Sequence, residues 1–168
     1  MNLRLASAWL FAVASITLAQ PVPVRSDATL RIAGDVATPL TLTIDDLRKL
    51  SPKAVDDRRG GDPKDALRYT GVLLRDVLDH AKLVERQPRG LRRSIVIATA
   101  RDDYKAIFSW AELYLSPIGD GVFVVYERDG SPLQAGEGPL ALVSLGDTSP
   151  GPRHVKWLQS IEVRMIAD

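Results

Sequence analysis

The side chains best suited to binding a ligand lie near the end of the sequence. Arg153, His154 and Lys156 follow a stretch rich in Gly, Pro and Ser and precede the alternating apolar residues of an expected strand. Basic side chains donate charged hydrogen bonds to anions, each contributing about 1.5–3 kcal/mol. If the segment is already extended, we expect Arg153 and Lys156 to leave the same face and to share one ligand. The alternative is a solvated edge or an ion pair with Asp147.

A second candidate segment lies between two expected strands. Arg101 and Tyr104 flank the adjacent acids Asp102 and Asp103. Adjacent aspartates are ordinary turn formers, which favours a hairpin turn over the rim of a pocket. Neighbouring residues on a strand point to opposite faces, so the two carboxylates are not placed to act as a paired acid and base. Arg101 and Tyr104 are the residues of this turn that could contact a ligand.

Composition limits the classes of protein and site. The 168 residues are 45% hydrophobic and 26% charged, which is typical of a soluble globular protein of one domain. Basic residues number 22 and acidic residues 21, so nothing indicates nucleic-acid binding. The chain has no cysteine, which excludes disulfides, zinc thiolate sites, iron–sulfur clusters and thiol nucleophiles. Residues 136–141 match a dinucleotide-binding fingerprint only formally, because they precede an expected strand instead of following one into a helix.

The first 28 residues are expected to be separate from the fold. Residues 1–19 combine one positive charge, Arg4, with an apolar run and small residues near Ala19, the pattern of a cleaved secretory signal peptide. Because Arg4 stands alone, we expect ordinary export instead of twin-arginine transport. The mature protein is then periplasmic or secreted and does not span a membrane. Residues 20–28 contain two prolines and no apolar periodicity, so we expect a flexible leader.

The remaining residues, 29–168, predict one mixed α/β (α+β) domain with short helices between strands. Strands are expected at residues 29–32, 40–42, 94–100, 104–108, 121–127, 140–145 and 155–166. Thr43 with Asp46, and Ser109 with Glu112, have the capping-box spacing that begins a helix. Apolar side chains at positions 74, 77, 78 and 81 predict an amphipathic helix. Residues 51–68 contain almost no apolar side chains and are expected to form a long polar loop.

Four segments of the chain carry a family resemblance. They are Leu-Thr-Ile-Asp-Asp-Leu at 42–47, Tyr-Thr-Gly-Val-Leu-Leu-Arg-Asp-Val-Leu at 69–78, Ala-Arg-Asp-Asp-Tyr at 100–104, and Arg-His-Val-Lys-Trp-Leu-Gln-Ser-Ile-Glu-Val at 153–163. In this order they resemble the oxidoreductase molybdopterin-binding domain family, the pterin-holding domain of sulfite oxidases and their bacterial relatives. The fourth segment is the most specific. In the second, Leu73 stands where the family commonly has proline.

The resemblance implies a sulfite-oxidase-type fold with a cleft for a pterin. Basic residues of the family's closing segment contact the pterin phosphate, which implies a cofactor-binding role for Arg153, His154 and Lys156, with Arg101 and Tyr104 at the same cleft. The family's enzymes also bind molybdenum through one cysteine between the first helix and the second segment. Here that interval, residues 51–68, holds no cysteine. Carboxylates are hard ligands that do not replace a soft thiolate. We therefore expect no cofactor, with molybdopterin as the alternative.

These observations predict an exported binding or accessory domain on a molybdopterin-oxidoreductase scaffold, without redox catalysis. Loops at residues 51–68, 101–104 and 146–156 are expected to frame a cleft for a small anion, a pterin-like ligand or a periplasmic or membrane partner protein. Two alternatives stay open. One is a molybdenum-cofactor-dependent oxidoreductase without a cysteine ligand, and the other is a purely protein-binding sensory or redox-complex module. No catalytic or metal-binding residue is assigned, so the sequence favours a protein that is not an enzyme without deciding the question.

Overall fold

The computed structural model describes residues 28–59 and 66–166. The expected signal peptide, residues 1–19, lies outside these ranges, as does all but the last residue of the expected leader, residues 20–28. Within the described ranges, no helix is both long enough and apolar enough to cross a membrane. The architecture is mixed α+β, with two sheets of mostly antiparallel strands and short helices, as the sequence predicted.

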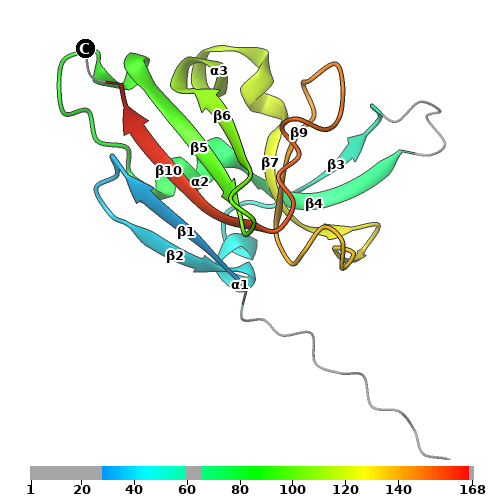
Figure 1. Ribbon diagram of the computed structural model, residues 1–168. Coiled ribbons are helices and arrows are strands. Elements are labelled where there is room, and N and C mark those ends of the chain that lie inside the picture. Colours follow the sequence, from blue (N-terminus) through cyan, green and yellow to red (C-terminus); the bar gives the residue numbers. More distant parts are fainter. Residues whose placement is uncertain (1–27, 60–65, 167–168) are drawn as a thin grey trace, which may run out of the picture.

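The first sheet places the last strand of the chain at its centre. Its order is β2 (Leu40–Thr43), β1 (Thr29–Gly34), β10 (Leu158–Met165), β5 (Ser94–Ala100) and β6 (Lys105–Ser109). Strands β1 and β10 pair in parallel, and the other pairs are antiparallel. In Figure 1 the red strand β10 lies between the blue strand β1 and the green strand β5. Strand β10 therefore joins the start of the described chain to its middle.

The second sheet is antiparallel throughout. It consists of β3 (Lys53–Asp57), β4 (Leu67–Leu73), β7 (Val122–Arg128), the short β8 (Ser131–Pro132) and β9 (Ala141–Ser144), of which β8 and β9 both pair with β7. A register shift between Thr70 and Gly71 lies where β4 comes close to β7. A Cβ atom at Gly71 would lie 2.2 Å from the Val124 carbonyl oxygen, so only glycine fits this contact.

Three α-helices in the described residues pack beside the sheets. Helices α1 (Ile44–Arg48) and α3 (Trp110–Leu115) begin at the predicted capping boxes, in which Asp46 and Glu112 are the acidic partners. Helix α2 (Leu74–Ala81) buries the predicted apolar positions 74, 77, 78 and 81. Two 3₁₀ helices, Gly90–Arg93 and Pro117–Gly121, connect helices and strands. The helices expected from the sequence are therefore confirmed.

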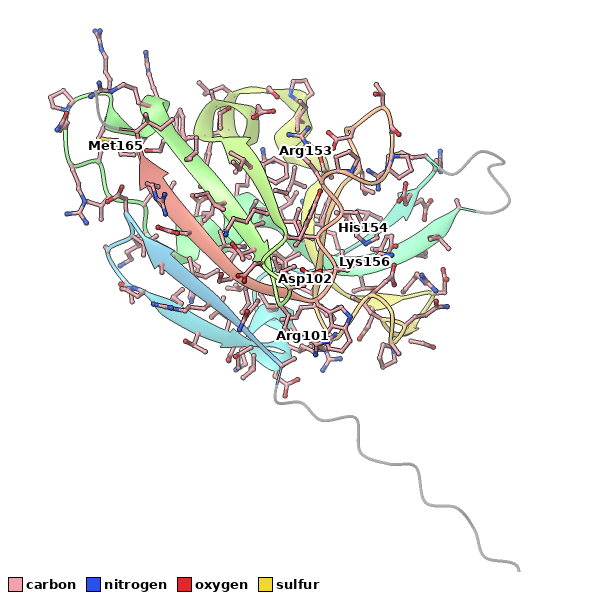
Figure 2. All side chains as sticks on the ribbon, viewed as in Figure 1. Arg101, Asp102, Arg153, His154, Lys156 and Met165 are labelled. Atoms are coloured by element: carbon pink, nitrogen blue, oxygen red, sulfur yellow. The ribbon has the colours of Figure 1, made fainter. Side chains whose placement is uncertain are left out.

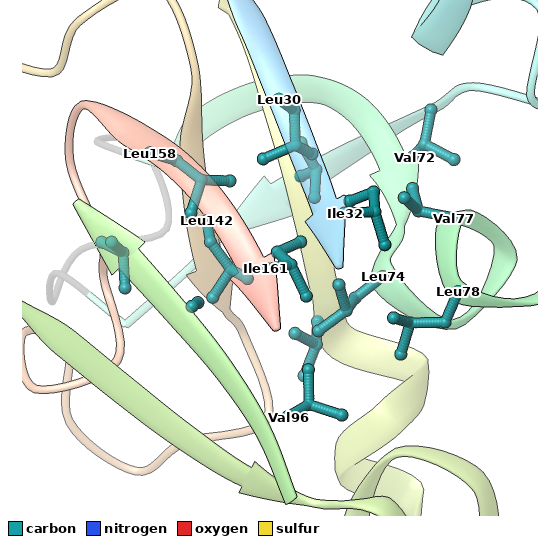
Figure 3. Packing of buried hydrophobic residues seen from close by; sticks show 14 of the residues in the cluster. Leu30, Ile32, Val72, Leu74, Val77, Leu78, Val96, Leu142, Leu158 and Ile161 are labelled. Carbon is teal, nitrogen blue, oxygen red and sulfur yellow. The ribbon is translucent and has the colours of Figure 1, made fainter. Parts of the chain in front are cut away.

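The main core lies between the two sheets, and α2 contributes to it. Figure 3 shows Leu30 of β1, Ile161 of β10 and Leu142 of β9 together with Leu74 and Leu78 of α2. All five side chains are fully buried, and burial of each stabilises the fold by about 1.5–3 kcal/mol. A smaller cluster covers the other face of the second sheet: Tyr69, Leu73, Phe123, Val125, Leu133, Ala141 and Val143. The two clusters hold the second sheet between them.

Two boundary predictions are wrong. Residues 51–68 are not one loop, because β3 and the start of β4 lie within them and pair with each other. Strand β3 is mostly polar and largely exposed, so it lacks the apolar alternation on which the sequence prediction rested. The final strand begins at Leu158 instead of Val155, which forms only an isolated bridge with Leu142. Residues 153–157 are therefore irregular backbone, so their side chains do not alternate between two faces as they would on a strand.

Candidate functional site

A strap of irregular backbone, residues 145–157, links β9 to β10 and carries three of the predicted ligand-binding side chains. Its end is fixed by two hydrogen bonds. The Trp157 amide donates to the Glu137 carbonyl oxygen (2.7 Å), and the Arg101 amide donates to the Trp157 carbonyl oxygen (3.0 Å). Trp157 has a φ of 52°, in the left-handed region of backbone conformation that residues other than glycine rarely adopt. The strap thus ends in a strained residue held from both sides.

The turn between β5 and β6 closes against the same strap. The Tyr104 hydroxyl donates a hydrogen bond to the Pro152 carbonyl oxygen (2.5 Å), and the Asp102 carboxylate accepts one from the Tyr104 amide (3.2 Å). In Figure 2, Asp102, His154 and Lys156 are grouped, with Arg101 at one end of the group and Arg153 at the other. Residues 101–104 form the predicted hairpin turn and also contribute to a cavity wall, so the two roles are not alternatives.

Arg153 belongs to an ion-pair network. Its guanidinium donates to Asp147 Oδ2 (2.9 Å) and Glu112 Oε1 (3.1 Å), and its Cζ lies 4.7 Å from the centroid of the Phe108 ring. The ion pair with Asp147, given above as the alternative, is therefore confirmed. The expectation that Arg153 and Lys156 share a face is wrong, because the segment is not a strand. A spacing of three residues on a strand would in any case place the two side chains on opposite faces.

His154 is a mostly buried side chain whose charge is suppressed. Its Nε2 atom has no hydrogen-bond partner among the described residues and lies 3.8 Å from Glu137 Oε1. Its ring meets the Tyr69 ring edge-on, with the centroids 6.3 Å apart. Burial lowers the pKa of His154 below its usual value; the Glu137 carboxylate opposes this shift and the Lys156 ammonium adds to it. The imidazole is therefore neutral at pH 7.

Beside the strap lies a buried polar cluster of Tyr69, Arg128 and Glu137, which we call the floor. Glu137 is only 6% exposed. It accepts hydrogen bonds from the Tyr69 hydroxyl (3.0 Å) and from the Arg128 guanidinium (3.1 Å). Burial and the adjacent carboxylate raise the pKa of Tyr69 to about 12. The charges of the floor neutralise each other, so this cluster stabilises the fold instead of attracting a charged ligand.

A second buried ion pair lies where β3 ends. Asp57 and Arg59 are 10% and 9% exposed, and their charged atoms are 2.7 Å apart. Arg59 also donates a hydrogen bond to the Ser144 carbonyl oxygen at the end of β9. The Arg59 guanidinium holds the pKa of Asp57 below its usual value, against the opposing effect of burial. The pair ties the end of β3 to the start of the strap and adds a second neutralised charge to the cleft.

Sequence reasoning missed both of these clusters. Asp57 and Arg59 lie in the predicted polar loop, because a sequence shows charge but not burial. Glu137 lies within the residues that resemble a nucleotide-binding fingerprint, which says nothing of its burial. The available signal was a single acid two residues before the apolar residues Pro139 and Leu140, where a charge needs a partner.

Two basic side chains at the cleft, Arg101 and Lys156, have no carboxylate partner within the described ranges. Lys156 lines a cavity of about 200 Å³, the rim cavity, together with Ala100, Asp102, Tyr104 and His154. Arg101 lines a neighbouring cavity of about 290 Å³, the shelf cavity. Four of the five predicted site residues thus line these two cavities.

The rim cavity has the chemistry of a small binding site. Lys156 supplies a positive charge, and the Tyr104 hydroxyl, which donates its proton to Pro152, can only accept a further hydrogen bond. The Asp102 carboxylate on the same wall repels a second negative group on the ligand. In the described part of the chain, no group of three His, Asp or Glu side chains is arranged to hold a metal ion. Lys156 therefore suits one anionic group of a ligand whose other edges are neutral.

The residues of the cleft fit one part of a molybdopterin and not the other. Lys156 and Arg101 match an anionic group and the hydrogen-bonding edges of a pterin. The metal of such a cofactor needs a soft ligand, and the chain has no cysteine. Asp57, in the interval where the resemblance implies a cysteine, offers a hard carboxylate that Arg59 already engages. The donor set therefore does not fit a thiolate-bound metal centre.

Comparison with known proteins agrees with this fold. Residues 59–167 match the family model described as the oxidoreductase molybdopterin binding domain. Among solved structures, the crystal structure of the sulfane dehydrogenase SoxCD from Paracoccus pantotrophus is similar, with a TM-score of 0.62 and 20% sequence identity. The match covers 89% of this chain and 40% of that one, so this chain spans less than half the length of that relative. No curated protein matches the chain in sequence.

Proposed function

The chain belongs to the oxidoreductase molybdopterin-binding domain family, and we propose that it acts as a binding or accessory domain without redox catalysis. Its ligand is a small anion of the pterin type, held in the rim cavity with its anionic group on Lys156. Membership of a molybdopterin-binding family does not support the expectation that no cofactor is bound. The proposed ligand therefore includes the organic pterin part of molybdopterin.

The division of the basic side chains supports this proposal most directly. Arg59, Arg128 and Arg153 are each paired with a carboxylate, whereas Lys156 lines a cavity and has no such partner within the described ranges. An unpaired ammonium beside a cavity is available to a ligand, and one charged hydrogen bond contributes about 1.5–3 kcal/mol. Tyr104 lies on the same wall with its hydroxyl proton donated to the Pro152 carbonyl oxygen, so Lys156 is the donor available to the anionic group.

The chemistry of the donor set supports the absence of redox catalysis. A thiolate ligand is missing from the sequence, and the carboxylate of Asp57 is engaged by Arg59. The rival function is a molybdenum oxidoreductase whose metal is held by pterin and oxygen ligands alone. Elemental analysis distinguishes the two: protein purified from its own host and passed through gel filtration is expected to carry no stoichiometric molybdenum. One molybdenum per chain would overturn the proposal in favour of the enzyme.

Calorimetric titration tests the ligand site itself. Wild-type protein is expected to bind pterin-6-carboxylate, and Lys156→Gln is expected to weaken this binding about tenfold, the loss of one charged hydrogen bond. Lys53→Gln removes an equal charge from exposed strand β3 and serves as the control. Equal affinity in all three proteins, or no binding to the wild type, would overturn the rim site and favour a purely protein-binding module.

We further propose that residues 1–19 direct export through the ordinary secretory route, which makes the mature chain periplasmic or secreted. A periplasmic or membrane protein is then the partner that this accessory domain serves. The lone Arg4 and the apolar run after it support this route. In cells lacking twin-arginine transport, the mature protein is expected to reach the periplasm with its N-terminus near Gln20. Retention in the cytoplasm of such cells would contradict the proposal.

A further inference from the structure

We propose that the shelf cavity is a second ligand subsite, which takes a planar aromatic group carrying a negative charge. The subsite is formed by Arg101 and Trp157 and is distinct from the rim cavity, to which neither residue contributes. It does not depend on what the rim cavity binds. Its features are one cation stacked on one ring, the fixed position of that ring, and walls that combine apolar and polar groups.

Arg101 and Trp157 form a stacked pair that presents a flat positive charge. The Arg101 Cζ atom lies 3.8 Å from the centroid of the Trp157 ring, which is face-to-face contact. Arg101 is exposed and lines the cavity. A guanidinium is planar and attracts aromatic faces on both of its sides, so a guanidinium resting on one ring can accept a second ring on its other side. Its edges remain available to donate hydrogen bonds to an anionic substituent.

The tryptophan ring is fixed in place before any ligand binds. Trp157 has a φ of 52° and is held through its amide and carbonyl groups by Glu137 and Arg101. Gly138 leaves room for the indole, because a Cβ atom there would lie 2.6 Å from Trp157 Cδ2. A strained backbone of this kind persists only where surrounding contacts determine it, and such residues cluster at ligand sites. A ligand that binds in the shelf cavity therefore costs little conformational entropy, because the indole ring is already held in place.

The walls of the shelf cavity suit a ring with polar edges. Pro139, Leu140 and Leu158 provide apolar surface, while Thr29 and Gln159 provide a hydroxyl and an amide. The volume of about 290 Å³ is enough for a ligand of one or two rings, since about 150 Å³ accommodates benzene. Pockets for small molecules combine apolar walls with a few polar groups in this manner.

The charge of the shelf cavity selects an anion. Within the described ranges, Arg101 has no carboxylate partner, and none of the residues that line the cavity is acidic. The rim cavity differs, because Asp102 lies on its wall beside Lys156. An aromatic carboxylate is therefore the simplest chemical class that satisfies both the stacking surface and the charge.

Nuclear magnetic resonance of the mature chain gives a direct test with nicotinate (pyridine-3-carboxylate) as the probe. Nicotinate is expected to shift the indole signal of Trp157 saturably and to leave that of Trp110 unchanged. Cyclohexanecarboxylate, with the same charge and no aromatic ring, is expected to bind about fivefold more weakly, because it loses the stacking energy. An unmoved Trp157 signal, or equal affinity for the two acids, would overturn the subsite.

Substitutions separate the shelf from the rim. Arg101→Gln is expected to weaken nicotinate about tenfold, and Arg101→Lys, which keeps the charge but loses the plane, about threefold. Arg68→Gln, at a 65% exposed side chain, is the matched charge control. Lys156→Gln is expected to leave nicotinate binding unchanged while weakening pterin-6-carboxylate, so failure at one site is distinguishable from failure at the other. Wild-type affinity in Arg101→Gln would refute the proposal.

Discussion

The floor and the rim of the cleft use similar side chains for opposite purposes. In the floor, Arg128 and Glu137 are 14% and 8% exposed in their side chains, and each neutralises the other. At the rim, Lys156 lines a cavity and lacks a carboxylate partner among the described residues. Because the floor pair is buried, removal of either member strongly lowers the stability of the fold. An exposed cation contributes little to stability. The comparison shows that partners and burial, not residue type, separate charges that support the fold from charges that remain available to a ligand.

Removal of the central carboxylate of the floor is expected to have the largest effect. Glu137→Ala leaves the buried Arg128 guanidinium with only the longer contact to Asp129 (3.9 Å), and the loss of its close partner is expected to lower the free energy of unfolding by about 3–5 kcal/mol. The matched control is Glu127→Ala, because Glu127 pairs with the half-exposed Arg48 and such pairs contribute about 0–1 kcal/mol. Urea unfolding measures both. Equal losses of unfolding free energy in Glu137→Ala and Glu127→Ala would show that the floor pair is no more important to stability than a surface pair.

Arg153 is expected to behave as part of the structure and not as part of the rim. Arg153→Ala leaves Asp147 and Glu112 without the guanidinium and is expected to lower the free energy of unfolding by about 1.5–3 kcal/mol. Its affinity for pterin-6-carboxylate is expected to stay within about twofold of the wild type, below the effect of one lost hydrogen bond. Thermal melts measure the expected loss of stability, and calorimetry measures the affinity for pterin-6-carboxylate. A stable variant with lost affinity would restore the shared-ligand hypothesis.

The helices and the general sheet architecture could be predicted because their signals are local. The capping box is visible in two residues three positions apart, Ser109 and Glu112, and the apolar face of α2 is visible within its eight residues. Strand β3 escaped prediction because its pairing with β4, and not apolar alternation, makes it a strand. Its polar side chains resemble those of a loop until the partner strand is known.

The sequence indicated which side chains lie near the cleft, but not what they contact. Arg101, Tyr104, His154 and Lys156 line the two cavities, and their binding of a ligand stays a prediction. The pairing of Arg153 with nearby Asp147 could be named as an alternative, but its second partner, Glu112, is distant in sequence and becomes a neighbour only through the fold. Burial of His154 was equally hidden, since neither ring contacts nor cavity walls appear in a single sequence.

Acidification is expected to weaken the fold through His154. Burial lowers the pKa of His154 in the folded state, so as the pH falls below about 6.5 the unfolded chain takes up its proton first. The free energy of unfolding should therefore fall between pH 7 and pH 5.5, above the range in which carboxylates titrate. His154→Gln should remove most of this slope, and His80→Gln, at an exposed histidine, should keep it. Urea unfolding at the two pH values decides, and an unchanged slope in His154→Gln would contradict the assignment.

The smallest effect on stability is expected at the rim. Lys156→Gln should change the free energy of unfolding by less than about 0.5 kcal/mol, because it breaks no ion pair among the described residues. The same variant is the one expected to lose pterin affinity. Melting temperatures of Lys156→Gln and Arg153→Ala, measured side by side, sharpen the contrast. A drop in Lys156→Gln as large as that in Arg153→Ala would place Lys156 with the structural charges.

The central place of β10 in the first sheet also governs when the chain can fold. As synthesis proceeds, β1 and β5 stand without the strand that joins them until residue 165 has emerged from the ribosome. The pairing of Arg31 with Ser160 closes a loop of about 130 residues, and such distant contacts form slowly. The first sheet can therefore be completed only at the end of synthesis. For the same reason, loss of the last dozen residues would split the first sheet and expose two strand edges to aggregation.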